Sequence, residues 1–410
     1  MDKEMKYRFG YLLCALFLAS INLRPAISSI SPLLETVRNE LGMSGSTASL
    51  LTSIPVLCMG VFSPFAVKLS TRWGLERVLT YSLIVIGFGT VLRLYANSSV
   101  LLLITAFLSG LGIAICGPLL SGFIKKYFAS RAASIVGMYS MALVLGAALS
   151  AGLSVPFQSM MHGSWRASLA VWALFALIAL PIWWQLASRE RAQKSGGKTT
   201  VSSESQLPLR NKRAWLLTVF FGLMAVMFYS MTAWLAPAIV SMGYDKGFAG
   251  GMLTLFTVIQ IPVSFFLPML IARFPKRMYW LLGCAMLELI GMILFMVHAS
   301  PWFIVIFLGL GAGGLFPMAL MLPIEETDSA EAASAWSAMN QSGGYIVGSL
   351  GPLFVGWVHD AWGGFELAFG GLAVLIVIML VLQLNIGNKK PRVAVQPSEQ
   401  IKVGANKVVS

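Results

Sequence analysis

The stretch Ser20-Ile21-Asn22-Leu23-Arg24-Pro25-Ala26-Ile27-Ser28 lies inside the first apolar segment of the chain and places an arginine among hydrophobic neighbours. If a helix begins at Phe9, Arg24 lies roughly 22 Å along it, beyond the middle of a hydrocarbon core about 30 Å thick. A guanidinium stays charged inside proteins and costs about 2.5 to 3.5 kcal/mol at the centre of a membrane helix. We therefore expect Arg24 to face a polar partner or ligand.

The helical period places a polar stripe on this segment, made of Ser20, Arg24, Ser28 and Ser31. Pro25 removes a backbone donor and disfavours helical geometry at the preceding residue, which predicts a local bend at Arg24. The six apolar segments before residue 188 contain no Asp or Glu. An anionic ligand is therefore the favoured partner of Arg24, and an uncharged structural partner on a neighbouring helix is the alternative.

The composition is that of a polytopic membrane protein. The 410 residues are 57% hydrophobic and 11% charged, whereas soluble domains have about 25% charged residues. A net charge of +13 could suggest nucleic-acid binding, but the basic residues lie in short loops between apolar segments, as in loops that face the cytoplasm. The sequence therefore predicts a lipid bilayer as the surroundings and no nucleic-acid partner.

Twelve apolar windows are long enough to span a membrane. They cover approximately residues 9–31, 47–69, 78–96, 100–123, 132–155, 166–187, 214–240, 248–271, 279–298, 302–323, 334–357 and 364–386. The 29 Lys and Arg residues fall before the first window, in every second loop or after the last window, except Arg24, Arg38, Arg93, Arg166 and Lys246. We therefore predict a multi-pass protein of the inner (cytoplasmic) membrane with both termini in the cytoplasm.

The windows divide into two sets of six, separated by a Gly-, Ser- and Lys-containing break typical of a flexible linker. The predicted units are an N-terminal six-helix bundle, a cytoplasmic linker, a C-terminal six-helix bundle and a polar cytoplasmic tail, at residues 1–187, 188–213, 214–387 and 388–410.

Short internal matches indicate that the two bundles are repeats. Gly110–Pro118 matches Gly309–Pro317, and the tripeptide Pro25-Ala26-Ile27 recurs from Pro237. Parallel repeats predict a binding site between the halves near the middle of the membrane. In this alignment Ala236 stands opposite Arg24, so only one half carries the charge, as a small or asymmetric anion would require.

Reactive side chains are scattered along the chain. The four cysteines lie within apolar segments at unrelated spacings, and the three histidines lie at outer ends or in loops. Neither pattern indicates a disulfide framework or a metal site. There is no nucleophile–base set or cofactor loop, so we predict no enzyme activity, no cofactor and no metal. A membrane sensor would need an output domain, for which the linker and tail are too short.

Several motifs occur together along the chain. They are Asn22–Ile27 with Pro32–Leu34, Arg93, Gly163–Arg166, Tyr229 with Trp234–Leu235, Gln341–Tyr345 and Gly351–Pro352. In these motifs the chain resembles the major facilitator superfamily and, within it, the cyanate and 2-nitroimidazole transporter group, over essentially its whole length. The resemblance implies an all-α fold of twelve helices that rocks between inward-open and outward-open states, with helices 1, 4, 7 and 10 lining the path.

The superfamily also carries a signature in the loop between helices 2 and 3. The loop here keeps Arg72, Gly74 and Arg77, which the resemblance assigns to the inner gate, but Thr71 stands where an aspartate is usual. A further departure is Val67, which replaces the first glycine. These changes affect the usual inner-gate charge pairing from this loop and not the fold.

Polar residues inside the windows are the candidate substrate ligands. Arg24 would clamp an anion by bidentate hydrogen bonds, and a polar stripe on helix 11 brings in Gln341 and Tyr345. Tyr229 and Trp234 are alternatively interfacial aromatics, and Asn22 reaches the ligand only if Pro25 distorts the turn. The complete candidate set is Arg24, Asn22, Tyr229, Trp234, Gln260, Gln341, Tyr345 and Ser28.

Three other charged residues have separate expected roles. Glu288 is the only carboxylate deep within a window, and burial favours its protonated form, so it is a candidate proton site. The alternative is that Glu288 holds helix 9 to a neighbour by a hydrogen bond. Arg93 and Arg166 lie near outer ends, where we expect anchors that snorkel to the interface, or else an anion-attracting mouth.

Taken together, these patterns predict a secondary active transporter that moves a small anion or a compact polar nitrogen-containing solute by alternating access. We expect a monomer with a small-molecule substrate and H⁺ as the coupling ion, by symport or antiport. The alternative is a proton-coupled exporter of drug-like or toxic compounds, which would need a large, aromatic and charge-indifferent pocket. The sequence is compatible with both import and export.

Overall fold

The computed structural model describes residues 3–43, 45–194, 207–274, 276–362 and 364–387, and within these ranges the chain forms helices and no strands. The first group of α-helices is α1 (Lys3–Ile21), α2 (Pro25–Ser28), α3 (Leu34–Leu41), α4 (Gly45–Trp73), α5 (Leu75–Val91), α6 (Ser99–Phe128), α7 (Ala132–Met160), α8 (Trp165–Val171) and α9 (Ala173–Lys194). The second group is α10 (Lys212–Ser241), α11 (Lys246–Arg273), α12 (Arg277–Met296), α13 (Pro301–Glu325), α14 (Ala330–Gly348), α15 (Leu350–Trp362) and α16 (Glu366–Ile386). Short 3₁₀ turns are η1 (Ser31–Leu33), η2 (Leu92–Tyr95) and η3 (Ala129–Arg131).

Ten segments of the described chain are long and apolar enough to cross a membrane. One of them, Ser99–Met160, contains the two helices α6 and α7, and α14 with α15 forms one further crossing. The described residues therefore cross the membrane twelve times. The prediction of an all-α fold with twelve transmembrane helices is confirmed.

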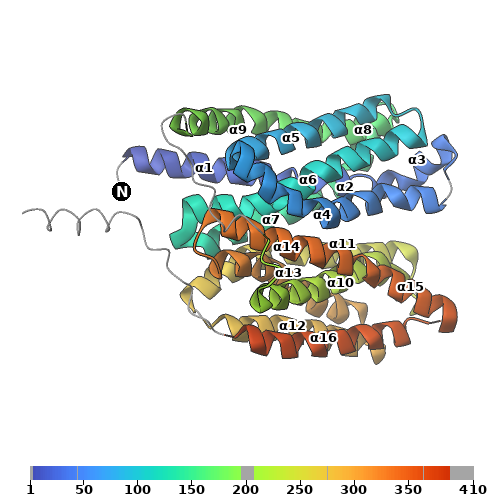
Figure 1. Cartoon of the computed structure of the whole chain (residues 1–410). Helices are drawn as coiled ribbons and strands as arrows, with labels where there is room; N and C mark the ends of the chain where they lie inside the picture. Colours follow the sequence, from blue (N-terminus) through green and yellow to red (C-terminus); the bar gives the residue numbers. More distant parts are fainter. Residues whose placement is uncertain (1–2, 44, 195–206, 275, 363, 388–410) are drawn as a thin grey trace, which may run out of the picture.

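The helices form two groups that lie side by side along their lengths, α1 to α9 in one and α10 to α16 in the other (Figure 1). We call the end that carries the α4–α5 and α6–α7 junctions and the starts of α10 and α12 the basic end. The N-terminus marks it in Figure 1. The unit boundaries at 187 and 214 stay a prediction, and residues 195–206 of the predicted linker and the whole tail lie outside the described residues.

Close packing inside each group depends on glycine. Gly112 of α6 lies against the backbone of Ser82 and Ile86 in α5, and a methyl group at this glycine would clash with them. In the other group, Gly313 of α13 lies against the backbone of Gln260 in α11 in the same way. Lipid gives helices little hydrophobic reason to associate, so such small contact surfaces supply the packing that brings them together.

The two groups are joined at the basic end and in the middle. The Lys125 ammonium of α6 donates a hydrogen bond to the Ile324 carbonyl of α13 at 2.9 Å. Nearer the middle, the Ser342 hydroxyl of α14 donates to the Gly60 carbonyl of α4 at 2.5 Å. This conformation is therefore closed at the basic end.

The predicted inner-gate residues lie at the junction of α4 and α5, with Arg72 in α4, Gly74 between the helices and Arg77 in α5. Gly74 has a φ of 96°, a left-handed conformation that favours glycine and lets α5 start directly after α4. Arg72 is exposed and Arg77 is half-buried, and neither forms an ion pair with a described residue. The buried charge here is Glu76, whose carboxylate pairs with the Lys126 ammonium at 2.5 Å within the same group.

The second group has an ion network at the basic end. Arg277, at the start of α12, pairs with Glu325 at 2.6 Å and with Glu326 at 2.5 Å, and Arg213 pairs with Glu326 at 2.9 Å. Glu325 and Glu326, at the end of α13, are thus paired with arginines at the starts of α10 and α12.

Candidate functional site

The first membrane crossing is broken at its arginine. Helix α1 ends at Ile21, and α2 starts at Pro25, with Arg24 as the preceding cap residue at φ −108° and ψ −34°. A proline cannot donate to the carbonyl four residues earlier, so the Ile21 carbonyl is left without its helical partner and the predicted bend is confirmed. Gly146 of α7 lies against this carbonyl, and a Cβ there would come within 2.5 Å of the Ile21 oxygen.

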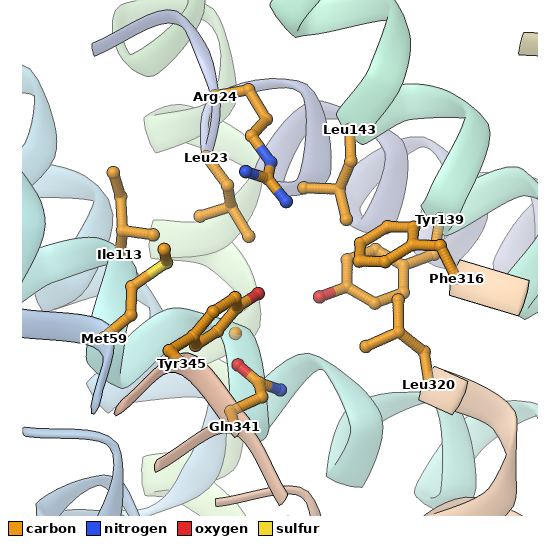
Figure 2. A pocket seen from close by; sticks show the side chains of 11 residues that line it. Leu23, Arg24, Met59, Ile113, Tyr139, Leu143, Phe316, Leu320, Gln341 and Tyr345 are labelled. Carbon is orange, nitrogen blue, oxygen red and sulfur yellow. The ribbon is translucent and has the colours of Figure 1, made fainter. Parts of the chain in front are cut away.

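Arg24 lines a cavity between the two groups (Figure 2). Its free volume is about 20 Å³, which is close to the space that a single water molecule needs. Both groups contribute to the lining, which consists of Leu23, Arg24, Met59, Ile113, Gly117, Tyr139, Leu143, Phe316, Leu320, Gln341 and Tyr345. In this conformation the cavity is small and mostly apolar, with a few polar groups.

Those polar groups converge on the cavity. Figure 2 shows the guanidinium of Arg24 pointing into it, with the hydroxyls of Tyr139 and Tyr345 and the amide of Gln341 also directed inward. The guanidinium carbon lies 5.8 Å from the ring centroid of Phe316, within range of a cation–π contact. A bidentate donor beside two hydroxyl donors suits a small planar anion or a polar heterocycle.

The positive charge of Arg24 has no acidic counterpart in the described chain. No described carboxylate forms an ion pair with it, and its electrostatic neighbours are the tyrosines Tyr229, Tyr345 and Tyr139. A guanidinium does not lose its proton in proteins, so the charge cannot be removed by titration. Arg24 therefore brings to the cavity a positive charge that no described carboxylate balances.

Two predicted ligands on α10 are not among the residues that line the cavity. The ring centroid of Tyr229 is 6.3 Å from that of Tyr345, and its buried hydroxyl is an electrostatic neighbour of the Arg24 guanidinium, although it makes no hydrogen bond of standard geometry with a described residue. The Trp234 indole donates to the Pro352 carbonyl at 2.9 Å and stacks on His359, so this side chain packs against α15. Helix α10 supplies none of the lining residues, although the resemblance implied that helix 7 lines the path.

Three further predicted ligands also lie outside the lining. The Asn22 amide donates to the Leu18 carbonyl at 2.6 Å, and the Gln260 amide donates to the Phe256 carbonyl at 3.0 Å. Ser28 is half-buried on α2. The predicted ligands that do line the cavity are Arg24, Gln341 and Tyr345.

Glu288 lies in α12, away from the cavity. Its side chain packs against Gly311 of α13, and its Oε2 atom is buried without a partner among the described residues. Phe316 and Leu320, which line the cavity, are five and nine residues after Gly311 and so lie on the other face of α13. Helix α13 thus separates Glu288 from the cavity, and its role as a proton site stays a prediction. Among the described residues, no cluster of three or more His, Cys, Asp or Glu side chains could hold a metal.

Sequence reasoning missed several lining residues. Tyr139 is the only tyrosine in the window 132–155, and a phenol hydroxyl inside a membrane span was a usable signal for a cavity. Met59 and Phe316 gave no such signal, because apolar residues of this kind occur on every face of a membrane helix.

Arg93 differs from its expected position. It lies in η2 with 0% exposure and donates from Nη2 to the Ala26 carbonyl at 2.6 Å. An interface anchor needs its charged head in the headgroup region. The expectation that Arg93 snorkels to the interface is therefore wrong.

Arg166 lies closer to its expected surroundings. It pairs with Glu40 at 2.6 Å at the end opposite the basic end, and both side chains are partly exposed. The hydrogen bond from the Arg166 guanidinium lowers the pKa of the Glu40 carboxyl below its ordinary value.

Known proteins with similar sequences are named as transporters. The chain is 33% identical over 380 residues to an uncharacterized transporter, YycB, of Bacillus subtilis, covering 91% of this chain and 92% of that protein. It is 32% identical over 379 residues to the cyanate transport protein CynX of Escherichia coli, covering 91% and 96%. It is also 29% identical over 384 residues to the 2-nitroimidazole transporter of Escherichia coli, covering 92% and 96%.

The fold is also that of known transporters. The solved structure of the proton:xylose symporter XylE, bound to 6-bromo-6-deoxy-D-glucose, superposes with a TM-score of 0.74 at 14% identity, covering 94% of this chain and 97% of that chain. The family model described as the Major Facilitator Superfamily matches residues 12–352. The chain therefore belongs to the major facilitator superfamily and is a multi-pass membrane transporter of small molecules rather than an enzyme.

Proposed function

We propose that this protein is a secondary active transporter that moves a small anion or a compact polar nitrogen-containing solute across the cytoplasmic membrane, with Arg24 as its main ligand. The observation that carries the proposal is the guanidinium of Arg24 pointing into a cavity between the halves with no carboxylate partner among the described residues. A bound anion would supply the missing negative charge and accept two parallel N–H bonds.

The surroundings of Arg24 support a compact substrate. Tyr139 and Tyr345 bring hydroxyl donors, Gln341 brings an amide, and the free volume of about 20 Å³ leaves little room for a bulky ligand in this conformation. Relatives of similar length are named for cyanate and for 2-nitroimidazole, which are both small and contain nitrogen.

The alternative is a proton-coupled exporter of drug-like or toxic compounds. The observation that favours it is the aromatic lining by Tyr139, Phe316 and Tyr345, since aromatic rings stack with neutral heterocycles. The two functions differ in the ligand charge and size that the cavity accepts.

We assign the basic end to the cytoplasm by the positive-inside rule, with both termini on that side. The conformation described here is then closed to the cytoplasm. Release to the cytoplasm requires the Lys125–Ile324 and Ser342–Gly60 contacts between the halves to separate. A single chain contains the whole cavity, which supports a monomeric transporter.

Energetics support ion coupling. Moving one negative charge inward against an inside-negative potential costs about 2.3 kcal/mol per 100 mV. Concentrative import of an anion therefore needs a co-transported proton or an exchanged anion. Glu288 remains the candidate carrier of such a proton, because it is the buried carboxylate of the second half without a partner for Oε2 among the described residues.

The test is ligand-induced thermal stabilisation of the purified full-length protein. Cyanate, nitrate and 2-nitroimidazole are titrated against the wild type and against Arg24→Gln, which keeps a polar side chain but removes the charge. We expect at least one of these ligands to raise the wild-type melting temperature and the Arg24→Gln variant to lose that shift, because the charge-assisted bonds are absent.

Arg166→Gln is the matched control, because it removes an arginine that pairs with Glu40 far from the cavity. It should keep the ligand-induced shift. A shift that persists in a folded Arg24→Gln protein would make Arg24 structural and overturn the proposal. Stabilisation by large apolar cations and not by the small ligands would replace it with the exporter function.

A further inference from the structure

Arg93 is the most deeply buried charge of the first helix group. Its side chain is 0% exposed, although it lies in η2, at the end of α5 away from the basic end. Its only hydrogen bond to the described residues runs from Nη2 to the Ala26 carbonyl at 2.6 Å. Nε and Nη1 are buried without a partner among the described residues.

The Ala26 carbonyl is available to Arg93 because the helix there is irregular. Helix α2 has only four residues, and the Ile30 amide donates to the Ile27 carbonyl rather than to Ala26. The guanidinium takes the place of the absent backbone donor with a charge-assisted bond. Arg93 is thereby fixed to the same short turn that carries Arg24.

The charge of Arg93 is not neutralised by the described chain. No described carboxylate forms an ion pair with it. Ala26 lies two positions after Arg24, so their Cα atoms are about 5–6 Å apart, and the carbonyl that holds Arg93 belongs to the turn that carries Arg24. An uncompensated charge in a medium of low dielectric acts over a longer distance than a charge in water, so Arg93 adds to the positive potential at the cavity.

We propose that Arg93 determines the charge preference of the substrate site: it is a second buried positive charge, attached to the α2 turn through the Ala26 carbonyl, that favours anions over neutral solutes. The inference rests on the proposed function of Arg24. Arg24 contacts the substrate, whereas Arg93 acts on it through the field and through the position of the turn.

The decisive comparison is between two variants that both keep a donor for the Ala26 carbonyl. Arg93→Gln keeps a hydrogen-bond donor but removes the positive charge. Arg93→Lys keeps the donor and the positive charge. Dissociation constants are measured on the full-length protein for cyanate and for 2-nitroimidazole, buffered so that the azole is uncharged. Arg166→Gln is again the control.

We expect Arg93→Gln to weaken cyanate binding about tenfold and to leave azole binding within about threefold of wild type. Arg93→Lys should stay within about threefold for both ligands, since the charge is kept. Each variant is first checked for cooperative unfolding without ligand, and Arg93→Met replaces Arg93→Gln if the glutamine variant does not fold.

Three results would overturn the inference. The first is an unchanged cyanate affinity in Arg93→Gln. The second is an equal loss of affinity for cyanate and for 2-nitroimidazole in that variant. The third is a loss of cyanate affinity in Arg93→Lys as large as that in Arg93→Gln. In these cases Arg24→Gln still abolishes binding and the proposed function survives. Failure of the wild type to bind any small ligand overturns both.

Discussion

A single proline, Pro25, determines how the neighbouring helix α7 packs against the Ile21 carbonyl. Pro25 leaves the Ile21 carbonyl without its helical donor, and Gly146 of α7 lets that carbonyl lie directly against the neighbouring backbone. The break in turn places Arg24 at the start of α2, with its side chain directed into the cavity. The position of Arg24 therefore depends on a residue more than a hundred positions later in the chain.

This dependence predicts the effect of one methyl group. Gly146→Ala would push a Cβ into the Ile21 carbonyl and should destabilise the protein by about 1–3 kcal/mol, as overpacking does. It should also weaken the Arg24-dependent ligand shift, because Ile21 and Arg24 share the break. The measurement is the melting temperature with and without ligand.

Gly152→Ala is the matched control on the same helix, because nothing lies within 4 Å of the position of its Cβ. Alanine favours a helix over glycine by up to about 1 kcal/mol, so this variant should be as stable as wild type or slightly more stable. Equal stability of the two variants would contradict the packing of the Ile21 carbonyl against α7.

At the scale of elements, the same tripeptide has a different local structure in each half. Pro25-Ala26-Ile27 begins the four-residue helix α2 directly after the break, whereas the same tripeptide from Pro237 lies inside α10, which continues to Ser241. The difference lies in the partners. In the first half the Ala26 carbonyl accepts from Arg93, whereas the corresponding Ala238 carbonyl accepts from the Ser241 hydroxyl at 2.7 Å.

The ion network at the start of α10 and α12 predicts a pH effect. Burial acts to raise the pKa of the Glu326 carboxyl, but the hydrogen bonds from Arg213 and Arg277 outweigh it and hold this pKa below its ordinary value. A depressed folded-state pKa contributes stability above the unfolded-state value of about 4.3, and this stability is lost as pH falls through the folded-state pKa. Glu326→Gln should therefore lower the melting temperature at pH 7.

The size of the effect should be about 2 kcal/mol, typical of hydrogen bonds between charged groups. The difference between wild type and variant should shrink below about pH 4. Glu331→Gln, at an exposed position of α14, should leave the melting temperature unchanged. A wild-type advantage that is independent of pH would show that Glu326 acts by packing and not by its charge.

At the scale of the whole molecule, the two halves meet at the basic end through few polar contacts. Lys125 crosses from α6 to the Ile324 carbonyl of α13, where the C-terminal end of a helix favours a cation. The next residue, Lys126, pairs with Glu76 inside its own half. Lys125 therefore connects the two halves, whereas the adjacent Lys126 binds within its own half.

Breaking the contact between the halves should open the basic end more often. In a variant background lacking the native cysteines, Ser337→Cys reports on access, because Ser337 is buried on α14 between Ser334 and Gln341, which face α6. Lys125→Ala should raise its labelling by a membrane-impermeant maleimide, added from the cytoplasmic side, several-fold. The reason is that the closed state loses a bond made only in that state.

Lys126→Ala is the control and should leave labelling unchanged, since its ion pair lies within one half. If Lys125→Ala and Lys126→Ala raised the labelling of Ser337→Cys equally, the cause would be a loosening of α6 rather than the release of the contact between the halves. No acceleration by Lys125→Ala would show that the closed state does not depend on this lysine.

The sequence by itself determined the membrane character, the twelve crossings, the bend at Pro25 and the charge that Arg24 carries there. These follow from properties that act locally: apolar length, a missing amide and a charge that cannot be removed. The tertiary structure decided which other side chains meet Arg24. Tyr139 and Phe316 joined it, and Trp234 and Gln260 did not, because helix rotation depends on how glycines and free carbonyls of neighbouring helices fit together. Arg93 shows the same limit: its position near a helix end indicated the surface, but the freed Ala26 carbonyl, which only the folded chain brings within 2.6 Å, holds it in the interior.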